Sequence, residues 1–180
     1  MSNLDQLTPG TWNVDPTHSS LTFVVRHLMV SKVRGRFGAF SGTATITDEK
    51  LLSSVSATAE VASIDTSDAG RDEHLKSADF FDVASFPTIG FKSTKITGSG
   101  DDYTLLADLT IKGVTKSVAF DLEFDGVGQD PWGNTKAGFS AEAEINRKDW
   151  GLEWNVALET GGVLVGEKVK LALDIQLVKA

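Results

Sequence analysis

The stretch VKLALDIQL, residues 169–177, decides the fold. Its odd-numbered positions are all aliphatic, whereas its even-numbered positions hold Lys170, Asp174 and Gln176 beside the small Ala172. Successive side chains of a β-strand point to opposite faces of a sheet. The alternation therefore predicts a strand with one buried face and one face in water.

The same period of two recurs toward the N-terminus. The other alternating stretches are residues 137–145, 118–124, 105–111, 89–91, 55–61, 40–46 and 21–29. Turn-forming sequences such as Lys112-Gly113, Asp125-Gly126 and residues 98–102 separate several of them. About eight strands at hairpin spacing predict an all-β fold, either an antiparallel barrel or a sandwich.

One segment departs from this period. Residues 67–76 begin with Ser67, a good N-cap residue, and carry acidic side chains in the first turn. The apolar residues that follow, from Leu75 to Phe81, are spaced too closely for a strand. We expect a short helix that ends before Phe86-Pro87 and lies across one mouth of a barrel, where it would act as a lid.

The composition suits one globular domain over residues 1–180, with residues 1–10 as an N-terminal extension. Hydrophobic residues make up 41% of the chain, and cysteine is absent, which excludes disulfides and thiolate chemistry. The net charge of −8 argues against a nucleic-acid surface or a polybasic membrane patch, because both need clustered Lys and Arg.

Targeting signals are not evident in the sequence. Residues 1–10 have neither a basic nor an apolar segment typical of a secretory signal, and no stretch approaches the ~18 apolar residues of a membrane-spanning helix. We expect a cytoplasmic protein with no integral membrane segment. An edge strand could pair across a two-fold axis to give a homodimer, although no residue pattern demands it.

The inward faces of the predicted strands mix phenylalanine with alanine and glycine. Small residues opposite Phe rings are compatible with a densely packed interior. They are equally compatible with an elongated apolar tunnel, since eight-stranded barrels occur both filled and with room for one ligand. Residue type and spacing leave these alternatives open.

Three histidines are the candidate metal ligands. In an unbroken strand, His18 and His27 would point to opposite faces because nine positions separate them, so a three-histidine site with His74 is not expected. His27 shares the apolar face of Phe23 and Val25. It is either a hydrogen-bonded core residue or a donor to the polar end of a ligand.

Arg71, Asp72 and His74 crowd one turn of the predicted helix. They form either a solvated capping cluster or a polar gate that contacts a ligand head group. Motifs for a nucleophile elbow, a phosphate-binding loop or a zinc protease are absent, and residues 112–116 suit a hairpin better than a phosphate loop. We expect no enzyme activity and no cofactor.

The chain carries an ordered set of short motifs that extends over roughly residues 12–175. The motifs are Trp12-x-Val14-Asp15-Pro16-x-His18-Ser19, Phe23-x-Val25-x-His27, Gly35-x-Phe37, Phe40-x-Gly42, Ser63-Ile64-x-Thr66, Arg71-Asp72-x-His74-Leu75, Phe80-Phe81-Asp82, Phe86-Pro87-x-Ile89-x-Phe91, residues 109–116 and Asn146-Arg147-x-Asp149-x-Gly151. In this order they resemble the YceI-like polyisoprenoid-binding family, whose fold is a lipocalin-like barrel.

The resemblance implies an elongated eight-stranded antiparallel barrel, with a short helix near one mouth, that binds a polyisoprenoid, an isoprenoid quinone or another amphipathic lipid. It favours the hollow interior over the packed one. The implied ligand-binding residues are Phe23, His27, Phe37, Phe40, Arg71, Asp72, His74, Leu75, Phe81, Phe91, Ile111, Phe120, Phe139 and Ala141. Two alternatives stay open: a stress-response or interaction module, and an enzyme or metal protein that uses the His, Arg and Asp cluster.

Overall fold

The computed structural model describes residues 6–28, 30–48, 52–156, 158 and 164–180. Its elements are β1 (Gly10–Val14), β2 (Ser20–His27), β3 (Ser31–Phe37), β4 (Phe40–Ile46), β5 (Leu52–Glu60), η2 (Val61–Ser63), β6 (Ile64–Asp65), α1 (Ala69–Lys76), β7 (Thr88–Ser99), β8 (Asp102–Ile111), β9 (Val114–Gln129), β10 (Thr135–Asn146), η3 (Arg147–Trp150) and β11 (Val165–Lys179). Of the predicted strand at residues 21–29, Met29 lies outside the described residues.

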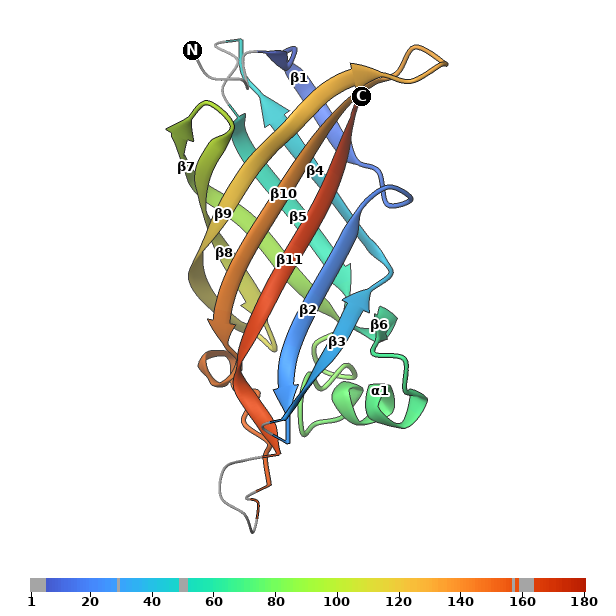
Figure 1. The fold of residues 1–180 in the computed structure, drawn as a ribbon, viewed down its shortest axis with the longest axis vertical. Helices are drawn as coiled ribbons and strands as arrows, with labels where there is room; N and C mark the ends of the chain where they lie inside the picture. The colour runs from blue at the N-terminus through green and yellow to red at the C-terminus, as the bar shows by residue number, and fades with distance from the viewer. Residues whose placement is uncertain (1–5, 29, 49–51, 157, 159–163) are drawn as a thin grey trace.

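The strands form an elongated antiparallel barrel (Figure 1). Eight of them, β1, β4, β5, β7, β8, β9, β10 and β11, follow one another around a ring that closes where β1 pairs with β11. This confirms the predicted eight-stranded barrel. We call the end at which α1 lies the helix end and the opposite end the far end (Figure 1).

Three further strands continue the sheet from β11. Residues 177–179 of β11 pair with β1, whereas residues 165–174 pair with β2, and β3 and β6 follow β2. The long β11 therefore belongs to the ring at the far end and to a flap of β2, β3 and β6 toward the helix end. Hydrogen bonds along β2 and β3 satisfy backbone groups that would otherwise remain unpaired at a sheet edge.

The alternation of the sequence reappears as alternating burial. Along β8 and β9, Leu105, Leu109, Phe120 and Leu122 are buried while their outward neighbours are more exposed. The predicted hairpin between these strands is also confirmed. Ile111 pairs with Val114, and the intervening Lys112 and Gly113 have φ values of +51° and +75°, as a tight two-residue hairpin turn requires.

The predicted short helix is confirmed, with its start moved by one residue. Asp68, rather than Ser67, is the N-cap, and its side chain accepts a hydrogen bond from the Arg71 backbone N–H at 3.0 Å. The helix ends at Lys76, and turns lead from it to β7. It lies beside β3 and β6 at the helix end of the barrel (Figure 1).

Two fully buried apolar side chains belong to the N-terminal part of the chain. Leu7 and Trp12 are both 0% exposed, and the Trp12 indole N–H donates to the Thr8 carbonyl at 3.0 Å. Of the ten residues expected to form an extension, residues 6–10 are described and residues 1–5 are not. The described part contributes Leu7 to the same core as the barrel strands.

Candidate functional site

An apolar cavity of about 260 Å³ lies inside the barrel. Aliphatic and aromatic side chains from the barrel strands, the flap and the segment around α1 supply nearly all of its lining. The only exceptions among the described residues are Thr22, Thr58 and Arg147. Such a lining excludes competing polar contacts and favours apolar ligands.

Nine of the fourteen residues expected to bind a ligand line this cavity. They are Phe23, Phe37, Leu75, Phe81, Phe91, Ile111, Phe120, Phe139 and Ala141. The other five, Phe40, His27, Arg71, Asp72 and His74, are not in the lining. The structure thus brings together all the predicted apolar residues except Phe40 and leaves the four predicted polar ones outside the lining.

A chain of aromatic contacts joins the flap to the segment after α1. The ring centroids of Phe23 and Phe37 are 5.6 Å apart, and those of Phe37 and Phe81 are 6.0 Å apart in an edge-to-face arrangement. Leu75 of α1 lines the cavity beside them. The helical segment therefore contributes apolar side chains, rather than its charged ones, to the interior.

Arg71 and Asp72 instead brace the turn that precedes α1. The Arg71 guanidinium donates to the Thr66 side-chain oxygen at 2.8 Å and to the Thr66 carbonyl at 2.7 Å. The Asp72 carboxylate accepts a hydrogen bond from the Thr66 backbone N–H at 2.9 Å, and Thr66 is only 3% exposed. These contacts fix the helix to the residue that follows β6 and account for both polar side chains without a ligand.

The three histidines belong to three different segments of the fold. His74 pairs with Asp79 at 2.8 Å and packs edge-on against Trp154, with ring centroids 4.6 Å apart. His27 ends β2, and His18 belongs to the turn that precedes that strand. Within the described residues, no group of His, Asp and Glu side chains is arranged to hold a metal ion.

The sequence interpretation missed Arg147, the one charged side chain in the described lining. It is 5% exposed, and its guanidinium donates to the carbonyls of Leu152 (2.6 Å), Gly166 (2.8 Å) and Val165 (3.3 Å). The central carbon of the guanidinium, Cζ, lies 5.8 Å from the centre of the Phe80 ring. Burial lowers the pKa of the guanidinium, and the nearby Glu167 partly offsets that effect.

Local sequence explains how Arg147 reaches this position. Asn146 caps η3 by accepting the Lys148 backbone N–H at 3.0 Å, and Gly151, with φ +81°, ends the turn in the left-handed conformation. The Trp150 indole N–H donates to the Leu109 carbonyl at 2.9 Å. The sequence did contain a signal for this inward position. The odd-numbered residues from 137 to 145 face inward, and Arg147 is the next odd-numbered residue.

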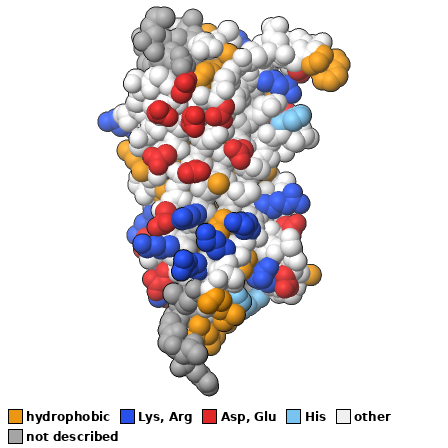
Figure 2. All heavy atoms as spheres, in the orientation of Figure 1, with side chains coloured by type: hydrophobic (Ala, Val, Ile, Leu, Met, Phe, Trp, Pro, Cys, Tyr) orange, Lys and Arg blue, Asp and Glu red, His pale blue; other side chains and the backbone are white. Residues whose placement is uncertain are grey.

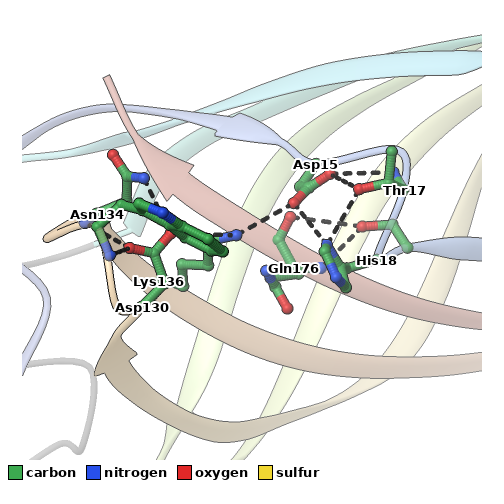
Figure 3. A network of polar contacts seen from close by, with 9 residues as sticks. Asp15, Thr17, His18, Asp130, Asn134, Lys136 and Gln176 are labelled. Atoms are coloured by element: carbon green, nitrogen blue, oxygen red, sulfur yellow. Dashed lines mark hydrogen bonds and ion pairs between the residues drawn. The ribbon is translucent and has the colours of Figure 1, made fainter.

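A polar network in the half of the barrel away from α1 holds the turn between β1 and β2 (Figure 3). The Asp15 carboxylate accepts hydrogen bonds from the Thr17 side chain at 2.7 Å and pairs with the His18 ring at 2.9 Å and with Lys136 of β10 at 3.4 Å. The hydrogen bonds from Thr17 and His18 hold the pKa of the Asp15 carboxyl well below its usual range. This network connects β10 to the turn before the flap.

No helix within the described ranges has both the length and the apolar character needed to cross a membrane.

The fold and the sequence both match known proteins. UPF0312 protein SA2479 of Staphylococcus aureus is 43% identical over 159 residues, which cover 87% of this chain and 90% of the relative. Burkholderia cenocepacia BcnA superposes with a TM-score of 0.75 at 23% identity, over 91% of this chain and 98% of that one. A polyisoprenoid binding domain from Saccharophagus degradans, implicated in plant cell wall breakdown, superposes with a TM-score of 0.72 at 14% identity, over 96% and 100%.

The family comparison covers almost the whole barrel. The matching segment, residues 12–177, begins in β1 and ends in β11, the two strands that close the ring. The chain belongs to the YceI-like domain family.

Proposed function

We propose that this protein binds a long apolar or amphipathic lipid, such as a polyisoprenoid or an isoprenoid quinone, inside the barrel. The observation that carries the proposal is the cavity of about 260 Å³ with its aliphatic and aromatic lining. An apolar cavity of ~150 Å³ stays dry and accepts benzene, so a larger one of the same character suits a hydrocarbon chain. The description of the Saccharophagus degradans domain as polyisoprenoid-binding supports the same ligand class.

Hydrocarbon burial supplies the affinity in this proposal. Each buried CH₂ group contributes about 0.8 kcal/mol, so a few five-carbon units suffice for stable binding. Ordering a flexible chain costs free energy and keeps the affinity below the simple sum. The site should therefore select ligands by length and bulk more than by head-group chemistry.

The head group, in this proposal, lies near Arg147. A guanidinium that is buried against backbone carbonyls gains from any additional acceptor oxygen that replaces its lost hydration. A quinone carbonyl, a hydroxyl or a phosphate offers such an oxygen. This assignment replaces Arg71, Asp72 and His74 as the expected polar end, because the contacts of those residues lie outside the cavity.

Binding without chemical turnover is part of the proposal. The lining holds no carboxylate or imidazole among the described residues, which leaves Thr22, Thr58 and Arg147 as its polar groups. General acid–base catalysis needs a group that exchanges a proton near neutral pH, and an arginine does not. A cytoplasmic location and a homodimer stay predictions, to be checked by cell fractionation and by light scattering of the purified protein.

Native mass spectrometry of the freshly purified protein, followed by organic extraction, tests the proposal. The expected result is a bound species of several hundred daltons that yields a prenyl fragmentation series. A protein that is purified empty and stays empty after incubation with quinones and prenyl lipids would contradict it. That outcome would favour the interaction-module alternative.

A further inference from the structure

Exposed apolar side chains gather at the helix end of the barrel. Leu28 is 42% exposed, Val30 is 85% exposed and Val156 is 47% exposed. Backbone hydrogen bonds place two of these segments side by side, since the Leu28 N–H donates to the Leu164 carbonyl at 2.8 Å and the Leu164 N–H donates to the Val156 carbonyl at 2.9 Å. We call Leu28, Val30 and Val156 the apolar tip.

Exposed basic side chains lie along the three strands that lead to this tip. We define the basic belt as the exposed residues Arg26, Lys32, Arg34, Arg36, Lys168 and Lys170, on β2, β3 and β11. Arg26 stands directly opposite Lys32 across the β2–β3 pair, an arrangement that repels. Of the carboxylates nearby, Asp65 lies 3.4 Å from Arg36 and Glu144 lies 3.7 Å from Lys168.

On the face drawn in Figure 2, the charged side chains are unevenly distributed. Lys and Arg side chains are massed on the half nearer the helix end, with a few Asp and Glu side chains among them. Most other Asp and Glu side chains of this face lie on the opposite half, and hydrophobic side chains lie below the basic ones. A net charge of −8 predicts no such basic cluster. The premise that Lys and Arg side chains are not clustered is therefore wrong, because net charge averages over a surface on which the charges are unevenly distributed.

The belt and the tip lie next to the cavity rather than remote from it. Val165, which pairs with His27 at the end of β2, lines the cavity, and so do Val25 and Val169 of the strands that carry the belt. Outward-facing cations and inward-facing valines alternate along the same strands. Only the sheet itself therefore separates a partner bound at this surface from the cavity.

We infer that the basic belt and the apolar tip form a docking surface for an anionic lipid bilayer. Clustered Lys and Arg side chains are attracted to anionic head groups, and apolar side chains beside them gain free energy by entering the interface. A nucleic acid offers the same negative charge but no apolar phase for Leu28 and Val30, so the bilayer fits both features. Docking would present the helix end of the barrel to the membrane.

Vesicle flotation tests this inference. The probes are vesicles of phosphatidylglycerol and phosphatidylcholine in equal parts, and vesicles of phosphatidylcholine alone. We expect the full chain to float with the anionic vesicles at low salt, at least tenfold more than with the neutral ones, and to be released as salt rises. Absence of flotation with anionic vesicles, or salt-sensitive binding to duplex DNA with no vesicle binding, would overturn the inference.

Two matched pairs of variants assign the binding to this surface. Lys32→Gln with Arg34→Gln should reduce flotation at least tenfold, while Lys92→Gln with Lys95→Gln on β7 removes the same charge and should leave it unchanged. For the tip, Leu28→Asn with Val30→Ser should weaken binding severalfold, and asparagine suits the φ of +55° at Leu28. Trp132→Ser, at a side chain 83% exposed in the β9–β10 turn, is the control. Equal losses in test and control variants would contradict the assignment.

The flotation test of docking can be distinguished from the test of lipid binding inside the barrel. Native mass spectrometry of Lys32→Gln with Arg34→Gln reports whether the interior still holds a ligand, and we expect that it does, because both side chains point outward. Loss of flotation with retained ligand supports docking. Flotation that persists in this variant refutes the surface assigned here and leaves the interior binding site unaffected.

Discussion

The ring of Phe23 fills the space above Gly35 on the neighbouring strand. The two residues are directly paired across β2 and β3, and a Cβ atom built on Gly35 would lie 2.8 Å from both Cε atoms of the ring and closer still to its tip. The absence of a side chain at Gly35 is thus what allows Phe23 to point into the cavity and contact Phe37. Both residues belong to motifs that the sequence displays.

Gly35→Ala should displace the Phe23 ring and destabilise the protein by about 1–3 kcal/mol, the cost typical of overpacking. Urea unfolding measures this change. Gly128→Ala is the matched control, because Gly128 also lies in a strand and a Cβ atom added to it would meet nothing within 4 Å. Equal stability of the two variants would show that the ring moves aside without strain.

Ala141→Phe should abolish the bound ligand by filling the cavity. Ala141 is 5% exposed and lines the interior from β10. Native mass spectrometry compares its occupancy with that of Ala119→Phe, which adds the same ring to the exposed face of β9. Undiminished occupancy in Ala141→Phe would refute a ligand in this part of the barrel.

Local sequence patterns predicted the strands but not the flap, and the family resemblance, rather than the alternation, favoured a barrel over a sandwich. Alternation identifies strands one at a time, and hairpins such as residues 102–129 pair neighbours along the chain. The strand β11 pairs with β1 at one end and with β2 along the rest, and both partners lie about 150 residues earlier in the chain. Alternation within a strand carries no information about such distant pairings. The N-cap was misplaced by one residue because Ser67 and Asp68 are both good caps, and only the structure shows which side chain accepts the Arg71 N–H.

Alternation predicted which strand residues line the cavity, but it gave no information on the direction of the polar side chains of α1. Phe23, Phe91 and Phe139 face inward as strand parity requires. The polar cluster of α1 has no such parity, because a short half-buried helix can direct Arg71 toward either the cavity or the preceding turn. Its hydrogen bonds to Thr66, five residues earlier, depend on the conformation of the intervening turn, which spacing alone does not reveal.

Acidification should weaken the protein through Asp15. An aspartate whose pKa is depressed in the folded state contributes stability at a pH above its unfolded pKa of ~3.9, and this contribution is lost as the pH falls below that value toward the folded pKa. Asp15→Asn should therefore lower stability at pH 7 and flatten its decline below pH ~4. Urea unfolding from pH 7 to pH 2 measures both effects.

Asp121→Asn, an exposed site on β9, is the control for the acid series. Its stability curve should run parallel to that of the unmodified protein. A curve for Asp15→Asn that is equally parallel would show that the network around Thr17, His18 and Lys136 contributes nothing to acid sensitivity. The flap would then be held by its strand pairing alone.

Replacing Arg147 separates its structural contacts from its contact with a head group. Arg147→Leu leaves the carbonyls of Leu152, Val165 and Gly166 without their donor, so we expect a loss of about 2–4 kcal/mol in the free energy of unfolding. Arg147→Lys keeps the charge but loses the planar fork that reaches several carbonyls. It should be destabilised less.

The ratio of the affinities for farnesyl phosphate and farnesol then measures the contribution of the head group alone. Farnesyl phosphate and farnesol share one hydrocarbon chain, and both need the folded barrel, so general destabilisation affects them alike. We expect the unmodified protein and Arg147→Lys to prefer the phosphate, and Arg147→Leu to lose that preference by tenfold or more, as measured by competition with a fluorescent prenyl probe. An unchanged ratio in Arg147→Leu would confine Arg147 to bracing η3 against β11, and the ligand head would then have to lie elsewhere.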